Sequence, residues 1–148
     1  MKRTTSFSHA KMLMILDKIP FFRDFTKPEQ EKIVDHAHFY VAEPDEKIIE
    51  QGDLDTAFYI LMSGQANVTL DDHKEPLASI SPGNFFGEMS FVLNIPRSTN
   101  VIAGSLCIML EVDRRLMGRL PAEIREKFKD QIIQKMARII QDFNKKSD

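Results

Sequence analysis

Two residues of opposite charge, Glu88 and Arg97, stand nine positions apart in a segment that contains Gly87. An arginine side chain presents a rigid fork of N–H donors that matches phosphate oxygens. A carboxylate offers two acceptor oxygens that suit a sugar hydroxyl. Gly87 permits backbone angles that other residues avoid, and the free N–H groups that begin a following short helix favour an anion. These groups together indicate a site for a small phosphorylated sugar.

A simpler interpretation is that Glu88 and Arg97 only form an ion pair in a loop, since such pairs are common and weak. The two residues alone do not decide between these interpretations. The full ordered string, GE-x-S-x5-PRS over residues 87–98, favours the ligand site. This string is similar to the phosphate-binding cassette of cyclic nucleotide-binding domains.

The resemblance extends roughly from Pro20 to Phe143. It includes the strings IPFFRDFTKPEQEKIV, residues 19–34, and EQGD-x4-FYILMSGQANV, residues 50–68. One departure is Asp45, where the family usually has glycine. Aspartate tolerates the left-handed backbone region better than most residues, so we expect the turn to survive.

The resemblance implies a sensor of cAMP or cGMP. Arg97 would contact the exocyclic oxygens of the cyclic phosphate, and Glu88 would accept a hydrogen bond from the ribose 2′-hydroxyl. Ser98 follows the arginine, where a hydroxyl can bond guanine in some members, but arginine-serine also occurs in cAMP receptors, and we favour cAMP. The expected binding residues are Gly87, Glu88, Met89, Ser90, Arg97, Ser98 and Thr99.

Further expectations concern the base and the output. The base is expected to lie against residues of the sheet, with candidates Ile60, Met62 and Val101. A lid is expected from the C-terminal helix, with candidates Met136, Ile139, Ile140 and Phe143, although that helix covering the core is the simpler interpretation. No cofactor and no catalytic activity are expected. The output would pass through the terminal helices to an effector protein, because the chain ends too soon for a helix-turn-helix.

The elements that would position these residues can be read from periodicity and caps. Ser8 begins a helix to Lys18, and Thr26 begins one to His36. A period of two and recurrent turns follow, which predict strands at about 38–42, 47–50, 57–62, 66–71, 77–80, 99–103 and 107–112. Asp113 begins a short helix, and Pro121 begins a long one to Phe143.

A single domain over residues 1–148 is therefore expected, with N-terminal helices at 8–36, a β-roll at 37–113 that holds the cassette at 81–101, and C-terminal helices at 114–143. The fold class is mainly β with flanking α. The roll is antiparallel, of the double-stranded β-helix or jelly-roll type, and eight strands are expected from the resemblance. Residues 1–8 are polar and expected to be frayed.

The composition of the chain argues against nucleic-acid binding, membrane insertion and internal disulfides. The net charge of −2 gives no basic excess for nucleic acid, and no apolar run is long enough to insert in a membrane. The single cysteine, Cys107, excludes an internal disulfide and is expected to be inert core. No signal peptide is apparent, and we expect a cytoplasmic protein.

Two alternatives remain. The first is a protein-interaction module of the same fold with a vestigial cassette, which the intact Glu88 and Arg97 disfavour. The second is a cupin-like metal protein, because His36, His38 and Glu43 have a spacing similar to cupin ligands. The glycine expected before the pair is absent, and His73 lies in a polar turn, so the metal alternative is the weaker one.

Overall fold

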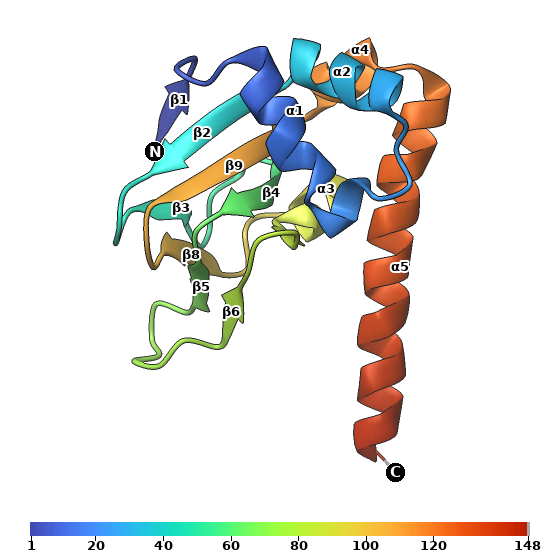
Figure 1. The fold of residues 1–148 in the computed structure, drawn as a ribbon. Helices are drawn as coiled ribbons and strands as arrows, with labels where there is room; N and C mark the ends of the chain where they lie inside the picture. Colours follow the sequence, from blue (N-terminus) through green and yellow to red (C-terminus); the bar gives the residue numbers. More distant parts are fainter. Residues whose placement is uncertain (148) are drawn as a thin grey trace.

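The computed structural model describes residues 1–147, which form two antiparallel sheets flanked by helices (Figure 1). The first sheet has the strand order β1 (Lys2–Thr4), β2 (His38–Ala42), β9 (Cys107–Val112), β4 (Phe58–Ser63), β7 (Phe85–Phe86). The second has the order β3 (Lys47–Ile49), β8 (Asn100–Ala103), β5 (Ala66–Thr69), β6 (Ala78–Ile80). The predicted antiparallel β-roll is confirmed. Nine strands are present in residues 1–147 where eight were expected.

The helices begin where the sequence predicted, because their caps are in place. Ser8 accepts a hydrogen bond at the start of α1 (His9–Asp17), and Asp113 does so at the start of α4 (Arg114–Arg119). Thr26 forms a capping box with Glu29 at the start of α2 (Lys27–His36). The other helices are η1 (Pro20–Phe22), α3 (Glu88–Leu93) and α5 (Ala122–Ser147), which runs past the predicted end at Phe143.

Alternation along the strands divides the core in two. In β4, Phe58, Ile60 and Met62 pack against the helices, whereas Tyr59 and Leu61 point between the two sheets. The helix-side cluster includes Phe128 and other buried residues of α5, so this helix covers core along its first half. Figure 1 shows the second half of α5 projecting beyond the sheets.

The N-terminal segment differs from the prediction that residues 1–8 are frayed. Lys2–Thr4 forms β1 and pairs with β2, which gives the edge strand a partner for its exposed backbone groups. The terminal ammonium of Met1 lies 2.5 Å from the carboxylate of Glu46. This ordering depends on a contact between segments 45 residues apart, which local sequence does not reveal.

Two turns have a left-handed backbone, and one of them is the turn expected at Asp45. Asp45 has φ of 71°, so aspartate does occupy the position where the resemblance implied glycine. Gly64 has φ of 93°, and a Cβ there would lie 2.2 Å from the carbonyl oxygen of Leu106. Cys107 is buried as predicted, and burial raises the pKa of its thiol. Among residues 1–147, no helix has both the length and the apolar character that crossing a bilayer requires.

Candidate functional site

The backbone at Gly87 begins the site. Gly87 follows β7, has φ of 87° and forms the N-cap of α3. A Cβ on this residue would lie 2.8 Å from Cδ1 of Ile49 and 2.9 Å from Nη1 of Arg97. Glycine is therefore required here both by the backbone angle and by the close approach of Arg97.

Arg97 is held in a buried position by groups from two other segments. Its side chain is only 2% exposed. Nη1 donates to the carbonyl oxygen of Gly87 at 2.8 Å, and Nη2 donates to the carbonyl oxygen of Ala57. Asp55 accepts from Nη2 at 2.8 Å and from Nε at 3.4 Å. These four hydrogen bonds fix the guanidinium, and among residues 1–147 the second N–H of Nη1 has no acceptor.

Glu88, in the first turn of α3, is also buried, with a side chain that is 7% exposed. Its Oε1 lies 2.5 Å from Nζ of Lys135 on α5. The same ammonium donates to the carbonyl oxygen of Phe85 at 2.7 Å. The simple interpretation, in which Glu88 pairs with Arg97, is wrong, because each charge has a different partner.

One cavity of about 160 Å³ contains every predicted binding residue. Its lining includes Gly87, Glu88, Met89, Ser90, Arg97, Ser98 and Thr99, together with Ile49, Val68, Phe86 and Val101. A larger cavity, of about 430 Å³, lies between η1 and α5, but neither Glu88 nor Arg97 lines it. The smaller cavity is the candidate site because it brings the acid, the guanidinium and the N-terminus of α3 together. That these seven residues bind a ligand stays a prediction.

Of the three candidates for apolar contact with the base, one lines the cavity and two do not. Val101 lines the cavity, but Ile60 and Met62 point to the opposite face of β4, among the residues that the helices cover. Strand alternation explains this error, because the predicted pair has even positions and the interior face of β4 has odd ones. Ile49 and Val68, in place of Ile60 and Met62, line the cavity together with Val101.

The expected lid is not in place over the cavity. Ile139, Ile140 and Phe143 are exposed, and no α5 residue lines the cavity. Met136 packs at the edge of the helix-side core, as the simpler interpretation held for it. Ile139, Ile140 and Phe143 lie in the second half of α5, which projects beyond the sheets (Figure 1).

The residues of the metal hypothesis do not converge. Nδ1 of His38 lies 3.9 Å from Glu111, and the carbonyl oxygen of His36 accepts a hydrogen bond from Arg115. Within residues 1–147, no three His, Cys, Asp or Glu side chains gather closely enough to hold a metal ion. Nothing in this geometry favours the cupin alternative.

Three features of the structure escaped the sequence analysis: the contact of Asp55 with Arg97, that of Lys135 with Glu88, and the environment of Glu111. Asp55 precedes β4 within the variable part of a matched string, and Lys135 lies on a helix 47 positions after Glu88. Burial, together with the nearby charge and hydrogen bond of Asp113, raises the pKa of Glu111 to about 7. A carboxyl group in a strand gives no local sign of such burial.

Comparisons with known proteins show which family the chain belongs to. Residues 41–123, more than half of the chain, match the family model of the cyclic nucleotide-binding domain. A cAMP-dependent protein kinase regulatory subunit from Colletotrichum orbiculare is 34% identical over 100 residues, which are 67% of this chain and 26% of that protein. A cGMP-dependent protein kinase from Toxoplasma gondii is 25% identical over 120 residues, 81% of this chain and 12% of the kinase.

A solved structure shares the fold. The crystal structure of a cyclic nucleotide-binding domain from Methylobacillus flagellatus KT superimposes with a TM-score of 0.75 at 24% identity, over 93% of this chain and 81% of that one. The chain spans about a quarter or less of the length of the two curated relatives. The matched region contains the strands from β3 to β9, the cassette and α4. The chain belongs to the cyclic nucleotide-binding domain family.

Proposed function

We propose that this domain is a non-catalytic sensor that binds cAMP in preference to cGMP. The observation that carries the proposal is the meeting of Arg97, Glu88 and the backbone N–H groups of α3 in one cavity. The guanidinium would bind the exocyclic oxygens of the cyclic phosphate, through its remaining N–H and by exchange of its half-exposed partner Asp55. Glu88 would accept from the ribose 2′-hydroxyl. Ser98 and Thr99 line the wall beside the arginine and would offer hydroxyl donors.

The preference for cAMP is supported by the regulatory subunit from C. orbiculare, whose name specifies cAMP. The apolar wall of Ile49, Val68 and Val101 would cover a purine without selecting between bases. We infer that no cofactor is needed and that the ligand acts by shifting the docking of the C-terminal helix. The effector protein would then recognise the terminal helices, in keeping with a cytoplasmic regulatory role.

The test is titration calorimetry with cAMP and cGMP on the purified domain and on Arg97→Ala, after removal of copurified nucleotide. A hydrogen bond to a charged group contributes roughly 1.5–3 kcal/mol, so the substitution should weaken binding by about tenfold to a hundredfold or more. Lys129→Ala is a matched control, because this cation lies on α5 outside the cavity. No heat with either nucleotide would contradict the sensor and favour the ligand-free interaction module.

A further inference from the structure

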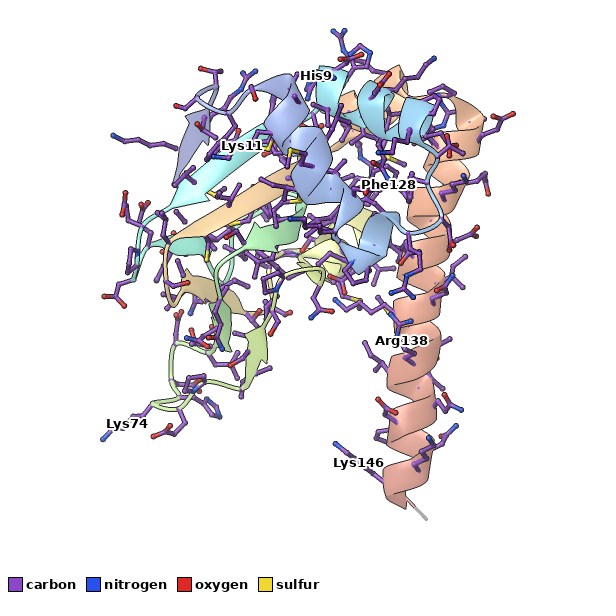
Figure 2. The ribbon with its side chains drawn as sticks, in the orientation of Figure 1. His9, Lys11, Lys74, Phe128, Arg138 and Lys146 are labelled. Carbon is purple, nitrogen blue, oxygen red and sulfur yellow. The ribbon has the colours of Figure 1, made fainter. Side chains whose placement is uncertain are left out.

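The ion pair between Lys135 and Glu88 joins α5 to the first turn of α3. Nζ of Lys135 lies 2.5 Å from Oε1 of Glu88, 2.7 Å from the carbonyl oxygen of Phe85 and 4.4 Å from the centre of the Phe85 ring. The ammonium therefore has three partners within one segment of the chain. Lys135 lies on α5 between Phe128 and Arg138. Figure 2 shows Phe128 near the other helices and Arg138 lower on α5, where the helix projects from the sheets.

Lys135 reaches Glu88 from outside the candidate site. Glu88 lines the cavity that contains Arg97, whereas Lys135 lines the larger cavity between η1 and α5. Neither residue lines both cavities. The ion pair is thus part of the wall between them, and Lys135 holds Oε1 without occupying the space of a ligand. In the proposed function, Oε2 would be the oxygen that accepts from the ligand.

We propose that Lys135 is a positioning residue that sets the recognition of the ribose 2′-hydroxyl through Glu88. The inference rests on the proposed function, because it concerns the same nucleotide. A carboxylate beside a cyclic phosphate places two negative charges close together, and the ammonium behind Glu88 offsets one of them. Fixing Oε1 also fixes the direction of Oε2, so a hydroxyl meets an acceptor that is already oriented.

Anchoring α5 does not require this lysine. Ile124, Phe128 and Ile132 of the same helix are buried in the helix-side core. Burial of a phenylalanine side chain contributes more to docking than a partly exposed ion pair does. Lys135 forms an ion pair between α5 and the cassette. Through this ion pair, the docking of α5 would be linked to recognition of the ribose. Because coupling between two sites is reciprocal, a nucleotide with a 2′-hydroxyl should in turn strengthen the docking of α5.

The experiment compares the dissociation constants of cAMP and 2′-deoxy-cAMP for the wild type, Lys135→Met and Lys135→Arg. The wild type should prefer cAMP by about tenfold or more, as expected for a hydrogen bond to a charged group. Lys135→Met should reduce this ratio at least about threefold, and Lys135→Arg should restore most of it. Lys129→Met, a substitution of the same type at an exposed position of α5, should leave the ratio unchanged.

The ratio of the two dissociation constants distinguishes the loss of Glu88 positioning from a general loss of stability. A loss of stability weakens both nucleotides alike and leaves the ratio intact, whereas a loss of positioning weakens only the nucleotide that has the hydroxyl. In a Glu88→Gln background, Lys135→Met should have no further effect on the ratio. A wild-type ratio retained in Lys135→Met would overturn this proposal while the sensor function stands. Failure of the wild type to bind cAMP would overturn both.

Discussion

Asp55 accepts hydrogen bonds from Nη2 and Nε of Arg97 at 2.8 and 3.4 Å, although the two residues are 42 positions apart. The pair joins the loop before β4 to the end of the cassette. The side chain of Arg97 is 2% exposed and that of Asp55 is 50% exposed. A buried guanidinium is thus paired with a carboxylate that is half exposed at the surface. In the proposed function, the cyclic phosphate would replace this carboxylate.

Removing the carboxylate of Asp55 should make the Tm of the domain depend more strongly on bound nucleotide. Asp55→Ala leaves a buried cation without its anionic partner, and breaking a buried pair costs about 3–5 kcal/mol, less here because Asp55 is half exposed. We expect a lower Tm for the ligand-free variant and a larger increase in Tm on adding saturating cAMP than in the wild type. Differential scanning fluorimetry measures both quantities. An unchanged ligand-induced shift would show that phosphate does not take over the role of Asp55.

Binding of cAMP should require the guanidinium group of Arg97 and not only its positive charge. Lysine at position 97 would keep the charge but provide a single ammonium in place of donors that reach Asp55, Ala57 and Gly87 at once. Arg97→Lys should therefore weaken cAMP binding by about tenfold or more. Calorimetry checks this, with circular dichroism to confirm that the variant is folded. Binding equal to that of the wild type would mean that charge alone suffices.

Gly87 should not tolerate alanine. A Cβ would meet Ile49 and Arg97 at less than 3 Å, and the φ of 87° is unfavourable for any residue with a side chain. Strained backbone of this kind costs about 1–3 kcal/mol, so we expect Gly87→Ala to lower the free energy of unfolding by at least that amount. Gly118→Ala is the matched control, because a Cβ at Gly118 has no atom within 4 Å. Urea unfolding of both variants measures the difference.

Stability should depend on pH through Glu111. Its Oε2 lies 3.4 Å from the hydroxyl of Tyr59, and Oε1 lies 3.9 Å from His38. Burial first, and then Asp113, raise its pKa to about 7 from an ordinary value of 4.5, whereas Arg115 acts in the opposite direction. The folded state therefore binds the proton more tightly, and this contribution to stability is lost as pH rises from about 4.5 to 7.

Glu111→Gln should remove that loss. The amide stays neutral, so the variant should gain stability relative to the wild type between pH 4.5 and 7, by up to about 3 kcal/mol. The difference between the two proteins is the quantity to measure, because burial lowers the pKa of His38 and adds an opposite trend below pH 6.5. Glu126→Gln, at an exposed position, should show no such gain. A constant difference across pH would contradict the burial argument.

Local signals in the sequence determined the secondary structure and the composition of the site. Helix caps at Ser8, Thr26 and Asp113 act within one turn, and strand alternation acts over a few residues, so both could be predicted. The cassette residues are likewise contiguous, and residues 87–99 contribute seven positions to one cavity because a tight turn and a short helix hold them together. The choice of Ile60 and Met62 failed because the pattern did not show which face of β4 lies inside.

Tertiary structure alone decided the partners of the charges. Asp55 reaches Arg97, Lys135 reaches Glu88, and Met1 reaches Glu46 from distant parts of the chain. No periodicity encodes such pairs, because each depends on how sheets and helices pack after they form. Burial has the same origin, and it is burial that raises the pKa of Glu111. The residue types of the site follow from sequence, whereas the orientation of their side chains and the ion pair of Glu88 with α5 follow from packing.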